Sequence, residues 1–190
     1  LKENWTEKDV EVYIVGHKKR KIVTRDGSVI VPHKSYSQLP NADLLWTPGG
    51  STEALTRLMY KKKHYLKYLI QISENAQYVT SVCEGALLLA QAGLLNGFKA
   101  TTHWAFMNCL RSYPEIEVIE EGHPRFVVDG NRITGGGISS GLDEALGIVE
   151  ILAGTEIAQQ VQLTTQYFPK PPVDGSIPEL FYGKIFQNLL

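Results

Sequence analysis

The chain has 190 residues and a mass of 21.2 kDa, a size that suits one domain with one hydrophobic core. Its 19 Lys and Arg residues balance 20 Asp and Glu residues, so the net charge of −1 gives no field that would recruit nucleic acid or an anionic membrane. Two cysteines and a longest apolar run of residues 86–90 exclude a disulfide scaffold, a cysteine zinc cluster and a membrane span. We therefore expect a soluble cytoplasmic protein with a single domain over residues 1–190.

The first half of the sequence predicts short strands followed by a long helix. Residues 11–16 (EVYIVG) have high strand propensity, and the Asp-Gly pair at positions 26–27 predicts a hairpin between residues 21–24 and 28–31. Residues 43–46 (DLLW) predict a strand that ends in the Gly-rich loop 47–50. Ser51 or Thr52 can cap the next helix, whose apolar face recurs from Leu55 to Ile70. The lysine run 61–63 is expected on its solvated face.

The second half repeats the order strand, loop, helix. Residues 78–82 (YVTSV) predict a buried strand that runs into Cys83, and residues 86–95 (ALLLAQAGLL) predict an internal helix. Further strands are predicted at residues 99–102, 115–119, 125–128 and 132–134, and further helices at 105–112, 142–153 and 155–167. The proline-rich end of the chain is expected to be irregular.

This order predicts an α/β fold in which helices cover both faces of a mostly parallel sheet. In such sheets, ligands bind beyond the carboxyl ends of the strands. The loops 48–50, 83–85 and 135–137 each follow a predicted strand. We therefore expect these three loops to share one site.

Cys83 is the main candidate for a nucleophile. It lies where a predicted strand turns into a helix, two residues before Gly85, which is the layout of a nucleophile elbow. The N-terminus of a helix favours thiolate over thiol, and its N–H groups can hold an oxyanion. The alternative is a small buried core cysteine. That alternative is our interpretation of Cys109, which lies inside a predicted helix.

His103 is the candidate partner of this thiol. It follows the predicted strand 99–102, at a position where an imidazole could orient or deprotonate the thiol. A packed or exposed loop histidine is the alternative. The other histidines have no metal-ligand spacing, and the glycines at 135–137 match neither a dinucleotide-binding nor a phosphate-binding loop. The sequence therefore predicts neither a metal nor a cofactor.

Several of these segments resemble the ThiJ/PfpI superfamily, which shares the fold of class I glutamine amidotransferases. The resemblance is carried by residues 48–50 (PGG), 81–90 (SVCEGALLLA), 97–104 (GFKATTHW) and 135–137 (GGG), the last leading into the helix with Asp143. Residues 162–178 (QLTTQYFPKPPVDGSIP) and the pair His103 and Trp104 resemble the isonitrile hydratase branch.

The resemblance implies a flavodoxin-like three-layer sandwich that forms a homodimer and acts on a small molecule. By position, Cys83 is the nucleophile, His103 is its neighbour, and the N–H groups of Gly50 and Glu84 are the oxyanion donors. The residues implied for the substrate pocket are Gly49, Thr102, Trp104, Gly136 and Gly137. The activity implied is that of a lyase or hydrolase that converts an isonitrile, R–N≡C, into an N-substituted formamide through a thioimidate on Cys83. Isonitrile hydratases carry Thr where this chain has Glu84, so the backbone donor is kept while the side chain differs.

Two other functions fit the same residues. One is a ligand-sensing domain, as in amidotransferase-like transcription regulators. The other is a glyoxalase, deglycase or redox chaperone in which Cys83 adds to aldehydes or is oxidised. The resemblance also implies a carboxylate partner of the cysteine on a strand upstream of the residues given, with residues 1–8 as the end of the following helix. We therefore expect about 20 to 30 further residues before Leu1, the size of one strand and its helix.

Overall fold

The computed structural model of the chain describes residues 10–24 and 26–177, and its centre is a four-stranded sheet. The strand order is β5 (Leu44–Thr47), β6 (Tyr78–Val82), β10 (Arg132–Gly135) and β9 (Phe126–Asp129). The first three strands are parallel, and β9 runs antiparallel to β10. Thr47 lies opposite Ser81, and Val82 lies opposite Gly135. This register brings the loops 48–50, 83–85 and 135–137 to one edge of the sheet, as the sequence predicts.

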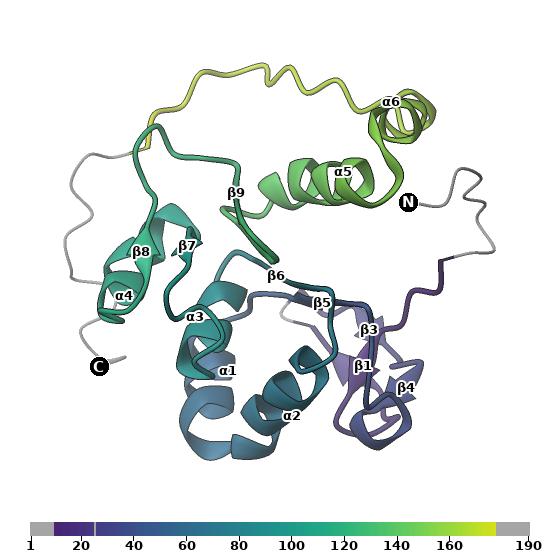
Figure 1. The fold of residues 1–190 in the computed structure, drawn as a ribbon, viewed down its shortest axis with the longest axis vertical. Coiled ribbons are helices and arrows are strands. Elements are labelled where there is room, and N and C mark those ends of the chain that lie inside the picture. Colours follow the sequence, from purple (N-terminus) through teal and green to yellow (C-terminus); the bar gives the residue numbers. More distant parts are fainter. Residues whose placement is uncertain (1–9, 25, 178–190) are drawn as a thin grey trace.

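Helices cover both faces of this sheet, so the molecule has three layers (Figure 1). One face carries α1 (Thr52–Thr56), the π-helical turn η3 (Arg57–Lys61), α2 (Lys63–Ser73) and α3 (Gly85–Gln91). The other face carries α5 (Ser140–Ala153) and α6 (Thr155–Thr164), which Gly154 separates at a φ of +91°. The predicted flavodoxin-like α/β sandwich with a mostly parallel sheet is therefore confirmed.

The described residues also form three small two-stranded sheets. β1 (Val15–Gly16) pairs in parallel with β4 (Lys34–Ser35), and the 3-10 turn η2 (Tyr36–Gln38) follows β4. β2 (Ile22–Val23) and β3 (Val29–Ile30) form the hairpin predicted from the Asp-Gly turn. β7 (Lys99–Ala100) pairs in parallel with β8 (Glu117–Val118), and the 3-10 turn η4 (Trp104–Phe106) and α4 (Met107–Arg111) lie between them in the chain.

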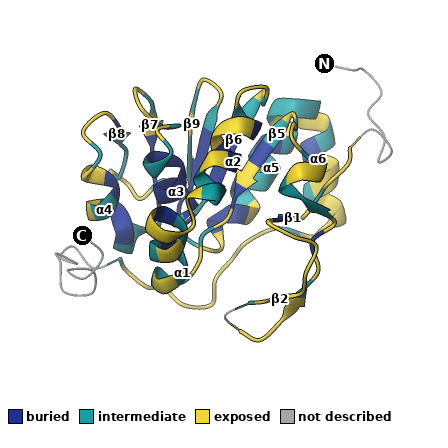
Figure 2. Cartoon of the chain, turned by 90° about the horizontal axis from the view of Figure 1, so that it is seen from below, coloured by how far each residue is buried: buried dark blue, intermediate teal, exposed yellow. Residues whose placement is uncertain are grey.

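The hydrophobic core is densest between the sheet and α3. Buried residues concentrate in the central strands and in this helix (Figure 2). Every residue of α3 from Gly85 to Ala90 is buried. Ala and Leu favour helix formation, and they can be buried here because they carry no polar side-chain group that would need a hydrogen-bond partner. β6 is buried along most of its length, as its β-branched sequence predicts. This packing fixes the point where β6 meets α3.

The helix predicted after Ser51 is interrupted. Ser51 caps it by accepting a hydrogen bond from the N–H of Ala54 at 3.3 Å. Lys62 then donates its N–H to the carbonyl of Arg57, five residues earlier, and leaves the helical region with φ −114° and ψ 56°. The π-type turn therefore ends with Lys62 as its C-cap, and α2 begins as a separate helix at Lys63, although no Gly or Pro marks the break. Periodicity alone therefore predicts one helix where the structure has α1 and α2.

The strand predicted for residues 11–16 is shorter in the structure. Only Val15 and Gly16 pair as β1, while Val12 is 79% exposed. The expectation for residues 1–8 lies outside the described residues, as does Pro178 of the proline-rich end. Within the described ranges, none of the helices has the length and apolar character needed to cross a bilayer.

Candidate active site

Cys83 forms the sharp turn between β6 and α3. Its backbone φ is 58°, in the left-handed region, which costs a residue other than glycine about 1–2 kcal/mol. Two hydrogen bonds hold this conformation: the N–H of Cys83 donates to the carbonyl of Gly135 at 3.0 Å, and Thr102 Oγ1 donates to the carbonyl of Cys83 at 2.8 Å. The residue itself is 7% exposed. The turn has the strained geometry of a nucleophile elbow.

Glycines allow the loop after β5 to lie directly against this turn. A Cβ at Gly49 would be 2.9 Å from the backbone nitrogen of Glu84 and 3.1 Å from Cys83 Cβ, and it would also collide with the Glu84 carboxylate. A Cβ at Gly85 would collide with the carbonyl of Thr47, at the end of β5. A Cβ at Gly50, by contrast, would make only an ordinary van der Waals contact, 3.9 Å from Ala54 Cβ. Two of the three predicted loops therefore meet at the cysteine.

His103 has a defined orientation at the start of η4. Its Nδ1 accepts a hydrogen bond from the N–H of Ala105 at 3.2 Å. In a neutral imidazole, this bond assigns the proton to Nε2, which is then a donor. The ring packs against Gly137, where a Cβ would be 3.2 Å from His103 Cδ2. The imidazole can therefore orient or stabilise a negatively charged group through Nε2–H.

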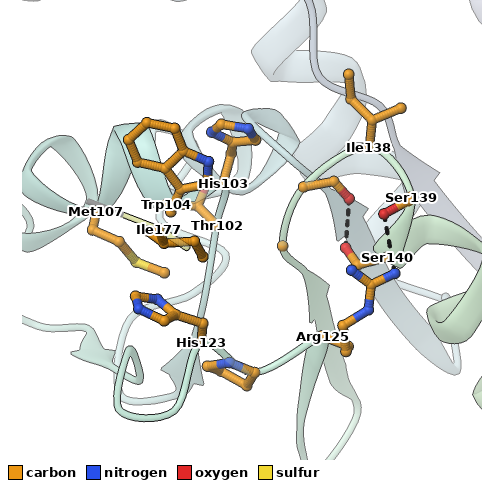
Figure 3. A pocket seen from close by; sticks show the side chains of 13 residues that line it. Thr102, His103, Trp104, Met107, His123, Arg125, Ile138, Ser139, Ser140 and Ile177 are labelled. Carbon is orange, nitrogen blue, oxygen red and sulfur yellow. Dashed lines mark hydrogen bonds between the residues drawn. The ribbon is translucent and has the colours of Figure 1, made fainter. Parts of the chain in front are cut away.

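A cavity of about 430 Å³ lies beside this histidine (Figure 3). Met107, His123 and Ile177 line one side of it, and Arg125 and Ser139 line the other. Of the predicted site residues, five line the cavity: Thr102, His103, Trp104, Gly136 and Gly137. Four do not: Gly49, Gly50, Cys83 and Glu84.

Hydrogen bonds to the backbone of Cys83 connect these two groups of residues. Thr102 lines the cavity and donates to the carbonyl of Cys83. Gly135 accepts from the N–H of Cys83 and is followed directly by Gly136 in the cavity wall. The elbow therefore lies behind the wall that Thr102 and Gly136 form. The structure brings all three predicted loops to one region, with the cysteine beside the cavity rather than in its lining.

Arg125 is a charged residue in the cavity lining that the sequence analysis did not select. Its Nε donates to Asp143 Oδ2 at 2.8 Å. Its Nη2 donates to Ser139 Oγ at 3.1 Å (Figure 3). Asp143 also accepts a hydrogen bond from the hydroxyl of Tyr167 at 3.1 Å. The signal that could have found Arg125 is a cation at the start of a strand whose partner strand ends in a Gly-rich loop.

Glu144 is a buried acid beneath the loop 135–137. It is 0% exposed, and neither carboxyl oxygen has a hydrogen-bond partner among the described residues. Burial raises its pKa to about 8. Gly135 makes room for it, since a Cβ there would collide with the carboxyl group. A glutamate within the apolar face of the predicted helix 142–153 was the available signal.

Cys109 lies in α4, away from the elbow. It is half-buried, packs against the core cluster, and has a pKa raised by that burial. This agrees with its interpretation as a packing residue.

The comparisons with known proteins agree on one family. The model of the DJ-1/PfpI family matches residues 1–151. The chain is 38% identical to an isonitrile hydratase of Pseudomonas putida over 90% of its own length and 72% of the relative's. It is 28% identical to the HTH-type transcriptional regulator CdhR of Pseudomonas aeruginosa, covering 74% of this chain and 40% of the regulator. A crystal structure of a ThiJ/PfpI family protein from Pseudomonas syringae matches with a TM-score of 0.78 and 34% identity, covering 86% of this chain and 66% of that one.

Proposed function

This chain belongs to the DJ-1/PfpI family, and from that premise we propose that it is a cysteine-dependent enzyme that adds water to an isonitrile. The observation that carries the proposal is the strained turn at Cys83, whose φ of 58° is held by hydrogen bonds from two other loops. Non-glycine residues in this conformation cluster at active sites, where surrounding contacts maintain the strain. The 38% identity to an isonitrile hydratase supports this substrate class.

The reaction proceeds in two covalent steps. Cys83 Sγ attacks the terminal carbon of R–N≡C, and the thiol proton ends on that carbon, which gives a thioimidate, R–N=CH–S. Water then adds to the same carbon, with one of its protons going to nitrogen. The C–S bond breaks as the carbonyl forms, and the second water proton returns to sulfur. The product is R–NH–CHO, and the thiol is regenerated.

The surrounding groups have separate roles in this scheme. His103 Nε2–H orients the sulfur and stabilises negative charge during attack, since its Nδ1 is occupied by the N–H of Ala105. The N–H groups of Gly50 and Glu84 are the proposed donors to the charge that develops on the substrate. Glu84 supplies this donor from its backbone, while its carboxylate is turned toward Gly49.

The cavity beside His103 is the proposed binding site for the R group. Its volume of about 430 Å³ suits a small molecule, and Trp104, Met107, Ile138 and Ile177 give it apolar walls. The reacting carbon would then extend past Gly136 and Thr102 toward the sulfur. Binding the R group next to the nucleophile lowers the entropic cost of attack.

Turnover of a simple alkyl isonitrile tests the proposal directly. We expect formamide production, followed by infrared loss of the isonitrile band and by mass spectrometry, and we expect Cys83→Ser to abolish it. Cys109→Ser is the matched control and should retain activity. Absence of turnover by the wild-type chain, or full activity of Cys83→Ser, would overturn the assignment.

A ligand-sensing domain is the second candidate, and the cavity favours it. The described lining does not include Cys83, so a ligand could bind without reacting. The regulator CdhR is a relative that covers 74% of this chain. Under this alternative, a small molecule that binds in the cavity raises the melting temperature of wild type and of Cys83→Ser equally, and neither protein turns over an isonitrile.

A further inference from the structure

A second cavity, separate from the candidate active site, lies between α2 and the segments that follow β1 and β4. Its volume is about 900 Å³, and it shares no residue with the first cavity. Figure 1 places β1 and β4 at the lower right, beside α2. The lining residues are His17, Lys18, Lys19, Ser35, Tyr36, Ser37, Gln38, Pro40, His64, Lys67, Tyr68 and Gln71. The proposed function uses none of them.

Aromatic rings form one wall of this second cavity. Tyr36 stacks on Tyr68 with ring centroids 4.1 Å apart and an interplanar angle of 9°. His17 lies over His64 with centroids 4.2 Å apart, and its ring also meets the edge of Tyr36 at 5.6 Å. The orientation of the Tyr68 ring is fixed, because its hydroxyl donates to the carbonyl of Leu39 at 2.9 Å. Rings held in this way give a preformed surface on which a planar ligand can stack.

The charged side chains that line this cavity among the described residues are all lysines. Lys18, Lys19 and Lys67 line it together with the two imidazoles, and within residues 10–24 and 26–177 no Asp or Glu does. Within the described residues, none of these lysines forms an ion pair. The chain as a whole carries a net charge of −1, so this is a local concentration of positive charge. Such a cavity attracts anions.

A metal ion suits this site poorly. Over the described residues, no group of three His, Cys, Asp or Glu side chains is close enough to hold a metal. His17 and His64 therefore bring no third ligand, and the three lysines oppose a cation. The rings and the lysines together fit a ligand with an aromatic part and an anionic part.

We propose that this cavity binds an aromatic phosphate monoester of the nucleoside monophosphate class. The lysine ammonium groups would contact the phosphate oxygens. The base would stack on the accessible rings of this wall, Tyr36 and His17, while the buried Tyr68 supports Tyr36 from behind. Gln38 and Gln71 offer side-chain amides to the base or sugar edge.

Calorimetric titration with adenosine 5′-monophosphate tests the proposal. Adenosine and inorganic phosphate are the two partial probes, because each lacks one half of the proposed ligand. We expect the monophosphate to bind at least about tenfold more tightly than either. Lys67→Gln should weaken binding by about tenfold or more, as loss of a charge-assisted hydrogen bond does. His64→Gln should also weaken binding, because it removes the ring against which His17 packs with centroids 4.2 Å apart. Lys61→Gln, which removes an exposed lysine outside the cavity, should leave affinity unchanged.

Three results would overturn the inference. One is absence of monophosphate binding by the wild-type chain at millimolar concentration. Another is equal affinity for the monophosphate and for inorganic phosphate, which would mean that the rings play no part. The third is an equal loss of affinity in Lys61→Gln and Lys67→Gln, which would mean that only the overall charge matters. Thermal unfolding of each variant checks that its fold is intact, and isonitrile turnover is not needed for any of these measurements.

Discussion

Replacing Glu144 by Gln should make the protein more stable at neutral and alkaline pH. The wild-type side chain is 0% exposed, and its oxygens have no partner among the described residues. Burial disfavours the charged form and raises the pKa from 4.5 to about 8. The folded state therefore holds the proton more tightly than the unfolded state does. For such an acid, the stabilising effect of protonation is complete below pH 4.5 and is lost progressively as the pH rises toward 8.

The size of the change in unfolding free energy follows from the difference between the two pKa values, 4.5 and about 8. Each pH unit between the two pKa values costs the wild-type protein about 1.4 kcal/mol of unfolding free energy. Between pH 5 and pH 7.5, this amounts to about 3 kcal/mol after allowing for partial titration at the two ends. Glu144→Gln carries no titrating group at this position. The difference in unfolding free energy between variant and wild type should therefore grow by about 3 kcal/mol over that range in favour of the variant.

Urea unfolding at pH 5 and at pH 7.5 measures this difference. Other titrating groups contribute equally to both proteins and cancel in the comparison. Glu150→Gln is the control on the same helix, since Glu150 is exposed and its pairing with Thr155 can be kept by the amide oxygen. A gap between Glu144→Gln and wild type that does not change with pH would refute the argument. It would mean that the carboxyl group is solvated or paired in the folded protein.

Further predictions concern the elbow and the assembly. Gly85→Ala should lower the unfolding free energy by about 1–3 kcal/mol or more, because the new Cβ collides with backbone, and thermal unfolding measures this. Gly137→Ala should leave the melting temperature nearly unchanged but lower isonitrile turnover, because the methyl group presses on the His103 ring at 3.2 Å; unchanged turnover would argue against a role for that imidazole. Iodoacetamide labelling with peptide mapping should modify Cys109 appreciably only at alkaline pH, because burial raises its pKa, and Cys83 should label first at neutral pH. Light scattering at micromolar concentration should find a homodimer, and a monomer would contradict the expectation from the family resemblance.

Local sequence signals predicted the order of the elements around the elbow, although α3 ends at Gln91 and not at residue 95 as predicted. The strand at residues 78–82 has the predicted bounds, because a run of β-branched residues between polar turns leaves little choice of conformation. The turn at Cys83 was predictable from the strand before it and the apolar helix after it. The break at Lys62 was not, since residues 57–63 contain no Gly or Pro that would mark the end of a helix.

The cavity was predicted only in part. His103 was found because it follows a predicted strand, and Thr102 and Gly136 were implied by the family resemblance. His123 and Ile177 were missed, since each comes from a segment with no local signal and reaches the cavity only through tertiary folding. Arg125 was missed although it stands at the start of a predicted strand. Whether Cys83 lines the cavity is also a tertiary property, because it depends on how the loops pack and not on their order in the sequence.

Residues 165–177, which follow α6, help to form the cavity wall but contribute little to the hydrophobic core. From its end near α6, this segment returns across the top of Figure 1 toward α4 and brings Ile177 to the cavity wall. Much of it is exposed, with Val173 75% accessible to solvent, and Tyr167 ties its start to Asp143. Residues along it can therefore be exchanged at little cost in stability. Evolution could broaden or narrow the range of accepted ligands here while the sheet, the elbow and their packing stay unchanged.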